Sequence, residues 1–319
     1  MLYFCIFYSF FVAPAIGVGQ TVAGFCNATT DGGSLGLVGP WGIYVSPIDG
    51  TLYIADYNYP RFQSVLPFSR IAVTVLSTNV SAPEDIFVDS SSHIYMSDYS
   101  YANGTVYIKR PNGSLSTIPA VPPSLYCSLA VITTPTGIVV DQFGNLYVSV
   151  SKCYILVRWA PNATAGVIVL GEMQITGGDN HHIKWARLMH WDEPRLTLYI
   201  VDSSNNRVLQ LKNGTNGTAI IIAGNNSAGA NLNQLNDPSG VWITRDGQTM
   251  YIADSGNNRV LKWTLGATQG SVVAGNASGV AGSTSQLLNY PGDVALDPTE
   301  TYLYVSDYYN HRIQRFRIV

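Results

Sequence analysis

The chain has 319 residues, and its 17 Lys and Arg residues nearly balance its 20 Asp and Glu residues, for a formal net charge of −3. Charged residues make up 12% of the chain, about half of the roughly 25% that is usual in globular domains. This balance, without a basic cluster interleaved with aromatic residues, argues against a nucleic-acid partner.

The first residues differ in kind from the rest. Residues 2–12 form an apolar and aromatic run broken only by Ser9, and small residues follow it as far as Gly19. This pattern resembles a secretory signal peptide over residues 1–19, and it predicts a secreted, extracellular protein. The leader contains no Lys or Arg, which leaves an uncleaved anchor as the alternative. A membrane span is not expected, because the run is shorter than the ~20 apolar residues that a span requires.

A repeated unit accounts for most of the remaining chain. Its clearest copy starts at the Pro-x-Gly turn of Pro238, continues as an alternating apolar run, and contains a second strand over residues 250–253 that ends at Asp254. A third strand is expected from Val260 and a fourth over residues 271–275, and four such short strands indicate an antiparallel meander.

Five further copies align with this one. The position of Asp254 recurs at Asp56, Asp98, Val150, Asp202 and Asp307, at intervals of 42, 52, 52, 52 and 53 residues. A period of roughly 40–50 residues carrying four strands is typical of a β-propeller blade. The sequence therefore predicts an all-β, six-bladed β-propeller as a single domain over residues 20–319. Its blades are expected at about 40–82, 83–134, 135–185, 186–237, 238–290 and 291–319.

The two ends of the chain predict how the ring closes. Residues 20–24 match the fourth strands of other blades, although they precede blade 1, and blade 6 stops after its third strand. We expect residues 20–24 to complete blade 6, which would pair an otherwise open sheet edge.

The loop after each second strand resembles the NHL repeat, and this resemblance covers nearly all of the chain beyond the leader. The pattern Asp-x-x-Asn-x-Arg is complete in blades 4, 5 and 6, partial in blades 1 and 2, and absent from blade 3. An Asp at a strand end can accept hydrogen bonds from the backbone N–H groups of its own turn and from the Arg five residues later. We therefore interpret the repeated residues as scaffold: Asp56, Asp98, Asp202, Asp254, Asp307, Arg61, Arg207, Arg259 and Arg312.

Three cysteines lie beyond the leader. In the propeller, Cys127 falls in the loop between blades 2 and 3, and Cys153 follows the second strand of blade 3 on the same face. We predict a disulfide between them, which would replace the loop contacts that blade 3 lacks in a secreted protein. Cys26 is then odd, and is either free or paired between molecules.

Nine Asn-x-Ser/Thr sequons fall in predicted loops or at strand ends. Together with the leader they predict an N-glycosylated protein, although Asn, Ser and Thr are also favoured in turns. The acceptor residues are Asn27, Asn79, Asn103, Asn112, Asn162, Asn213, Asn216, Asn225 and Asn276.

Some NHL-like propellers are peptidyl-α-hydroxyglycine amidating lyases that hold zinc through histidines of several blades. Here His190 is the only histidine expected on an inner strand, and its counterparts are Tyr44, Phe87, Val139, Trp242 and Ala295. Zinc requires three or four ligands in tetrahedral geometry, so this pattern argues against a zinc site.

The Pro-x-Gly turns place variable residues around one mouth of the channel. We predict a ligand surface there that includes Trp41, Glu84, Asp85, Arg187 and Asp293. Asp85 and Asp293 flank blade 1 and are candidate Ca²⁺ ligands, as in lactonase-like six-bladed enzymes. No cofactor is otherwise implied. The favoured function is non-catalytic binding of an extracellular protein or small molecule, and the alternative is a metal-dependent enzyme resembling the amidating lyases or the lactone hydrolases.

Overall fold

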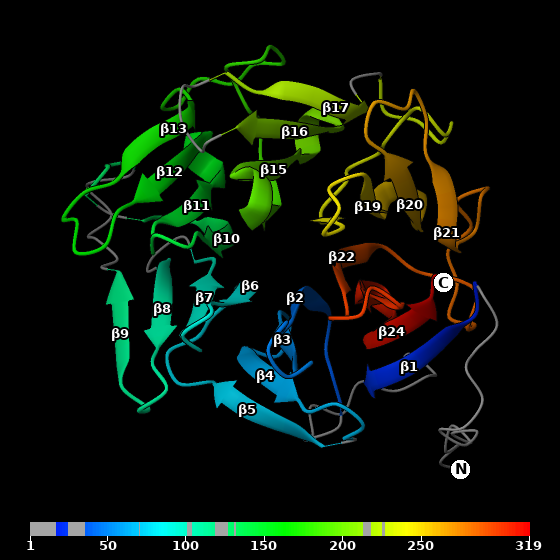
Figure 1. The fold of residues 1–319 in the computed structure, drawn as a ribbon, viewed down its shortest axis with the longest axis horizontal. Helices are drawn as coiled ribbons and strands as arrows, with labels where there is room; N and C mark the ends of the chain where they lie inside the picture. The colour runs from blue at the N-terminus through cyan, green and yellow to red at the C-terminus, as the bar shows by residue number, and fades with distance from the viewer. Residues whose placement is uncertain are drawn as a thin grey trace.

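The computed structural model is a closed ring of six four-stranded antiparallel sheets, which confirms the predicted six-bladed β-propeller (Figure 1). The structure describes residues 17–24, 36–69, 71–100, 104–118, 127–130, 132–212, 218–224 and 227–319. Most of the predicted leader (residues 1–16), Cys26 and the sequons at Asn27, Asn103, Asn213, Asn216 and Asn225 lie outside the described residues.

Each of blades 1 to 5 contains four sequential strands, ordered from the channel outward. Blades 1 and 2 consist of β2 (Pro40–Val45), β3 (Leu52–Asp56), β4 (Arg61–Val65) and β5 (Ala72–Leu76), then β6 (Pro83–Val88), β7 (Ile94–Asp98), β8 (Thr105–Lys109) and β9 (Leu115–Ile118). Blades 3 and 4 consist of β10 (Pro135–Val140), β11 (Leu146–Val150), β12 (Ile155–Trp159) and β13 (Val167–Gly171), then β14 (Ala186–Asp192), β15 (Thr197–Asp202), β16 (Arg207–Lys212) and β17 (Ile220–Gly224). Blade 5 consists of β18 (Val241–Ile243), β19 (Thr249–Asp254), β20 (Arg259–Thr264) and β21 (Ser271–Gly275).

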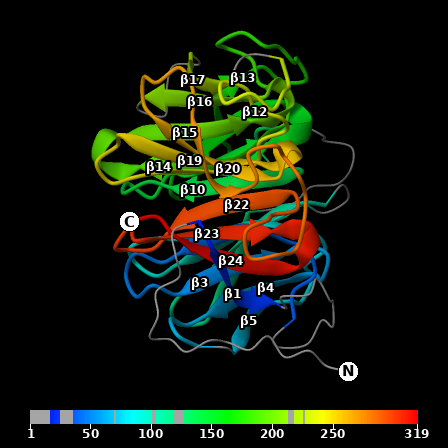
Figure 2. The same cartoon turned by 90° about the vertical axis from the view of Figure 1, so that its right-hand side faces the viewer.

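Blade 6 is built from both ends of the chain, as predicted. Its strands β22 (Pro291–Leu296), β23 (Tyr302–Asp307) and β24 (Arg312–Arg317) are completed by β1 (Gly19–Gly24). Gly19 pairs with Phe316 and Gly24 with Arg312 in an antiparallel register, and β1 lies along β24 in the side view (Figure 2). The N-terminal strand thereby occupies the outer position that blade 6 would otherwise leave empty.

In the described part of the chain, short 3-10 segments follow second strands in four blades. They are η2 (Ser151–Cys153), η4 (Ser203–Asn205), η5 (Ser255–Asn257) and η6 (Tyr308–Asn310), and a fifth, η3 (Glu193–Arg195), follows the inner strand of blade 4. In the part of the chain that the structure describes, no helix is long and apolar enough to cross a membrane.

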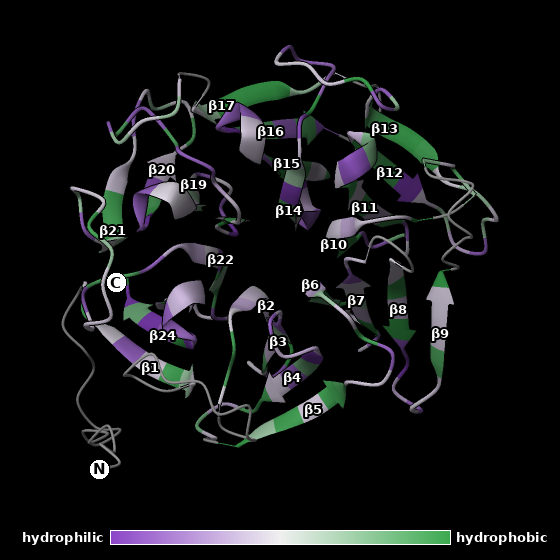
Figure 3. Ribbon diagram, turned by 180° about the vertical axis from the view of Figure 1, so that it is seen from behind, coloured by the Kyte–Doolittle hydropathy of each residue, from purple (hydrophilic) through white to green (hydrophobic). Residues whose placement is uncertain are grey.

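Apolar side chains fill the space between neighbouring blades. One cluster joins Val139 and Tyr147 of blade 3 to Leu198 and Ile200 of blade 4, all of them less than 5% exposed. Strands coloured by hydropathy show apolar stretches in the sheets around the ring (Figure 3). Because each blade is sandwiched between two others, inner strands such as β10 and β11 are buried on both sheet faces, whereas outer strands such as β5 and β9 stay partly exposed.

The repeated Asp–Arg pairs are buried scaffold. In blade 5 the Arg259 Nε donates to an oxygen of Asp254 at 2.8 Å, and both side chains are 0% exposed. One detail of the prediction is wrong, because the backbone N–H bound by Asp254 belongs to Asn236, 18 residues upstream, rather than to the turn that follows the strand. Arg259 similarly donates to the carbonyls of Ala230 and Asn231. The pair therefore ties the end of the second strand to the loop arriving from the preceding blade.

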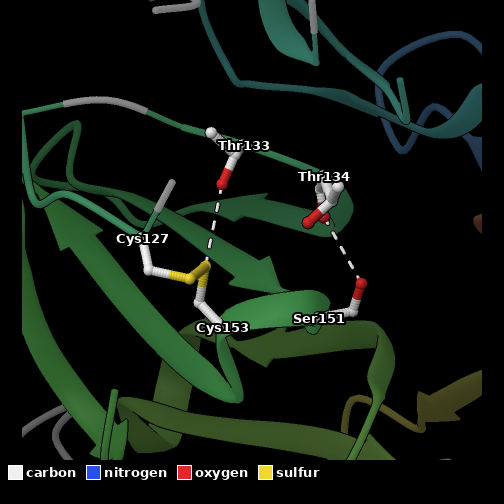
Figure 4. Close-up of a disulfide and its surroundings, with 5 residues drawn as sticks. All are labelled: Cys127, Thr133, Thr134, Ser151 and Cys153. Carbon is white, nitrogen blue, oxygen red and sulfur yellow. Dashed lines mark hydrogen bonds between the residues drawn. A yellow bond between two sulfur atoms is a disulfide. The ribbon is translucent and has the colours of Figure 1, made fainter. Parts of the chain in front are cut away.

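The predicted disulfide joins Cys127 to Cys153 (Figure 4). The bond fastens the loop entering blade 3 to η2, in the blade that lacks the Asp–Asn–Arg set. Thr133 Oγ1 lies 3.7 Å from Cys153 Sγ, and Ser151 Oγ donates to the Thr134 carbonyl at 3.4 Å.

Four of the predicted glycosylation sites lie on described segments. Asn79, Asn112 and Asn162 are exposed, and Asn276 is half-buried after β21. Exposure is compatible with modification of these residues, which stays a prediction.

Candidate functional site

A cavity of about 510 Å³ occupies the centre of the ring. All six inner strands contribute to its wall. In most of them the lining residues begin at the third or fourth residue of the strand and continue into the hairpin that leads to the second strand. The hairpin residues that line it include Pro47, Ile48, Gln142 and Arg245, which are exposed. The cavity therefore opens on the face that carries these first hairpins.

This is the face opposite the Pro-x-Gly turns, where the sequence predicts the ligand surface. On that predicted side Arg187 of blade 4 reaches across the ring to Trp41 of blade 1, with its guanidinium carbon 4.8 Å from the centre of the Trp41 ring. Tyr308 packs edge-on against Trp41 at 5.2 Å between ring centres. Trp41 is 5% exposed, so the expectation of an exposed aromatic on the rim is wrong. Its ring instead fills this end of the channel.

Glu84 and Arg187 lie together at the same end. Both side chains are partly buried, and Arg187 also lies 3.5 Å from Asp237. Burial raises the pKa of Glu84 to about 8, and the positive charge of Arg187 partly offsets this. The Trp41 Nε1 and Arg187 Nε groups are buried without a protein partner. These predicted residues do converge, but they close the mouth rather than surround an opening.

Asp85 and Asp293 lie at the narrow end of the cavity, each 5% exposed. The two oxygens of Asp85 accept from the N–H groups of Ile86 and Ile138, both at 2.8 Å. Asp293 accepts in the same way from Val294 at 2.8 Å and from Ile43 at 2.9 Å. Each carboxyl group thus joins its own inner strand to that of the next blade.

Two serines that sequence reasoning missed complete these links. Ser97 Oγ accepts from the Asp85 N–H at 2.9 Å and donates to the Thr136 carbonyl at 2.6 Å. Ser306 Oγ makes the equivalent bonds to the Asp293 N–H at 2.7 Å and to the Trp41 carbonyl at 2.6 Å. The signal was present in the sequence, since both serines stand immediately before the repeated Asp of the second strand.

The pKa values of the two carboxyl groups are shifted upward. Burial raises the pKa of Asp85, opposed by its two backbone N–H bonds. Burial also raises the pKa of Asp293, and the negative charge of Asp85 raises it further. The protonated form of the pair is favoured because two buried like charges repel each other.

Four rings form an arc around the middle of the cavity, from residues that occupy the same position on four inner strands. Phe87 and Tyr44 lie 4.9 Å apart between ring centres, Tyr44 and Trp242 lie 5.9 Å apart, and Trp242 and His190 lie 4.4 Å apart. We call Phe87, Tyr44, Trp242 and His190 the aromatic arc. Tyr44 and Trp242 meet although blade 6 separates their blades, because blade 6 contributes the small Ala295 at this position.

His190 is an uncharged member of the arc. Burial lowers its pKa to about 3, so the imidazole is neutral at physiological pH. Among the described residues, no group of three or more His, Cys, Asp or Glu side chains is arranged to hold a metal ion. Asp85 and Asp293 do lie near each other, as the predicted Ca²⁺ site requires, but they are two carboxyl groups rather than a larger ligand set.

Comparisons with known proteins support the class of the fold. The model of the NHL repeat matches residues 288–316, which span the turn before blade 6 and most of that blade. NHL repeat-containing protein 2 of Bos taurus is 34% identical over 85 residues, which are 24% of this chain and 12% of that protein's length. The repeat and the six-bladed ring together support an NHL-repeat propeller.

Solved structures share the fold at low sequence identity. A Bacteroides thetaiotaomicron protein of unknown function has a TM-score of 0.73 at 17% identity, covering 94% of this chain and 75% of that one. An auxiliary nutrient binding protein of the same species has a TM-score of 0.73 at 14% identity, covering 93% and 75%. A streptogramin B lyase has a TM-score of 0.59 at 13% identity, covering 90% and 95%. A binding protein and an enzyme are thus both built on this architecture.

Proposed function

We propose that this protein is a non-catalytic binding module that takes a small molecule in its central cavity. The observation that carries the proposal is a cavity of about 510 Å³ with an aromatic arc in its wall and one accessible mouth. Ligand sites are usually concave, largely apolar pockets of this size with a few convergent polar groups. The nutrient-binding description of one structural neighbour agrees with such a role.

Binding should depend on the arc. A fragment library screened by ligand-observed NMR against the full chain should yield ligands that Trp242→Leu and Tyr44→Leu weaken at least tenfold. Trp185→Leu is the matched control, because Trp185 is also partly buried but lies directly before β14, outside the cavity lining. Ligands that all three variants bind as the wild type does would show that the cavity is not the binding site.

We also propose that the protein is secreted and N-glycosylated. The apolar leader and the exposure of Asn79, Asn112 and Asn162 support this. A soluble ligand outside the cell, or the surface of an extracellular protein, would then be the partner.

A metal-dependent enzyme is the second candidate, and the pair formed by Asp85 and Asp293 is the observation that favours it. A cation between the two carboxyl groups would relieve their mutual repulsion. Metal analysis of the purified protein tests this candidate: one equivalent of Ca²⁺ that is lost in Asp85→Asn would support it, and a metal-free, ligand-binding protein would reject it.

A further inference from the structure

The charges around the cavity are strongly unequal. Its lining includes one guanidinium group, that of Arg245, against eight carboxyl groups: Asp85, Asp89, Asp141, Asp192, Glu193, Asp293, Asp297 and Glu300. Burial favours the protonated form of Asp85 and Asp293, and Asp192 is paired with Arg195 at 3.1 Å. Five acidic side chains and one guanidinium group therefore remain. His190 adds no positive charge, because burial lowers its pKa to about 3. A cleft lined by charges of one sign, with walls of low polarity, focuses its field on the space inside. The cavity therefore attracts cations and repels anions.

Several of these carboxyl groups serve the hairpins rather than a ligand. Asp89 accepts from the N–H groups of Ser91 and His93, and Asp141 accepts from those of Phe143 and Asn145. Their negative charge still faces the mouth, but their geometry is explained by the turns. Asp85 and Asp293 also accept backbone N–H bonds, from Ile86 and Ile138 and from Val294 and Ile43. They differ in position, because they lie inside the channel beyond the arc.

The aromatic arc supplies the second requirement for holding a cation. The face of an aromatic ring carries negative electrostatic potential, and several rings around one space are a recognised way to bind ammonium groups. Phe87, Tyr44 and Trp242 are each partly exposed, and all three line the cavity. Asp85 precedes Phe87 by two residues on β6, which places the carboxyl level roughly 7 Å deeper than the arc at about 3.3 Å per residue.

We infer that the cavity binds a small organic cation, with its ammonium group against the aromatic arc and facing the carboxyl groups of Asp85 and Asp293. This inference rests on the proposed function and names the chemical class of its ligand. A bare metal ion fits the arc less well, because it prefers oxygen ligands to rings. An organic ammonium group is weakly hydrated and can lie against the rings while its charge faces the acids.

The decisive experiment compares two probes of the same shape and different charge. Choline carries a quaternary ammonium group, and 3,3-dimethylbutan-1-ol replaces that nitrogen by carbon. Titrations of the full chain, followed by calorimetry and by the indole signals in NMR spectra, should show choline binding at least ten times more tightly than the alcohol. The signal of Trp242 should shift, and that of Trp185 should not.

Three variants and one control variant separate the parts of the inference. Trp242→Leu should weaken choline binding at least tenfold, and Phe87→Leu repeats the test at a second ring of the arc in case the first variant folds poorly. The double variant Asp85→Asn with Asp293→Asn should lower the affinity for choline towards that for the alcohol without changing the affinity for the alcohol. Trp185→Leu should bind both probes as the wild type does.

The outcomes distinguish this inference from the proposed function. Equal affinity for choline and the alcohol, lost in Trp242→Leu, would overturn the cation inference and leave small-molecule binding in place. Choline binding that survives Trp242→Leu, Phe87→Leu and the double Asn variant would place the cation elsewhere and overturn the inference. Binding of neither probe would overturn it as well, while fragments found by the library screen would still decide the proposed function.

Discussion

Replacing Arg259 tests whether the repeated Asp–Arg pairs are scaffold. The change Arg259→Met keeps most of the side-chain volume and removes the guanidinium group. That group is fully buried and donates to Asp254 at 2.8 Å, to the Ala230 carbonyl at 2.7 Å and to the Asn231 carbonyl at 3.1 Å. A third carbonyl, that of Ala277, accepts from it at 3.4 Å. Its loss leaves a buried carboxyl group without its counter-charge and three carbonyls without this donor.

The size of the effect follows from burial. Breaking a buried ion pair by removing one partner costs about 3–5 kcal/mol, whereas substitutions at exposed positions usually stay within about 0.5 kcal/mol. Lys262→Met is the matched control, because Lys262 is exposed on the same strand β20. Urea denaturation of both variants and the wild type, followed by circular dichroism, measures the free energies of unfolding.

A double variant shows whether the two side chains act together. If the cost comes from the uncompensated carboxylate, Asp254→Asn combined with Arg259→Met should be less destabilised than the sum of the single variants. An Arg259→Met protein as stable as Lys262→Met would refute the scaffold interpretation. Loss of ligand binding at unchanged stability would assign these pairs to a functional site instead.

Four further predictions concern stability and processing. Deleting residues 20–24 should expose the outer edge of β24 and abolish cooperative unfolding, and an unchanged melting curve would contradict the role of β1 in closing the ring. Reducing the bond between Cys127 and Cys153 should lower the free energy of unfolding by roughly 3 kcal/mol through the entropy of the opened loop, and peptide mapping under non-reducing conditions should recover the two cysteines linked. Folding raises the pKa of Asp85 from 3.8 to about 7, so the folded protein binds this proton more tightly than the unfolded chain does. The stability that the bound proton contributes is therefore lost as pH rises from about 4 through about 7. Asp85→Asn should flatten this part of the free energy of unfolding measured in urea against pH, and parallel curves for the variant and the wild type would refute the shift. Expressed in eukaryotic cells, the protein should reach the medium and lose mass on enzymatic removal of N-linked sugars, with Asn162→Gln removing one glycan, whereas retention in the cytosol without a mass change would contradict the leader.

The fold could be predicted because each blade repeats the same local signals. The alternation of apolar residues locates the strands, the spacing of Asp residues counts the blades, and the misplaced strand at residues 20–24 reveals how the ring closes. The pairing of Cys127 with Cys153 followed from placing both in loops on one face. All of these features depend on short stretches or on neighbouring blades, and a repeat makes such relations readable.

The orientation of the candidate site depends on contacts across the ring, which the repeat does not encode. Trp41 and Arg187 stand at corresponding positions of blades 1 and 4, so the period places both near one mouth but does not show that one covers the other. The backbone partner of Asp254 was also misplaced, since it lies 18 residues upstream in the loop that arrives from the preceding blade. The same offset recurs for Asp56, Asp202 and Asp307. The sequence period therefore assigns each residue to a level of the channel, whereas the size of the side chains that meet across the channel axis decides which end of the channel stays open.

The inner strands show how six similar blades produce a cavity with one closed end. The third residues of the six turn segments that begin these strands alternate between small and large: Gly42, Asp85, Gly137, Leu188, Gly240 and Asp293. A side-chain carbon added to Gly42, Gly137 or Gly240 would come within 3 Å of the backbone of the next blade, so the strands approach most closely at this level and the larger residues lie against the glycines. Two residues further along each strand, small and large residues no longer alternate around the ring. It becomes Tyr44, Phe87, Val139, His190, Trp242 and Ala295, which no blade-to-blade contact requires to be aromatic. These residues differ from blade to blade and line the cavity, as a binding site requires, and this is the reason to look for the ligand at the aromatic arc.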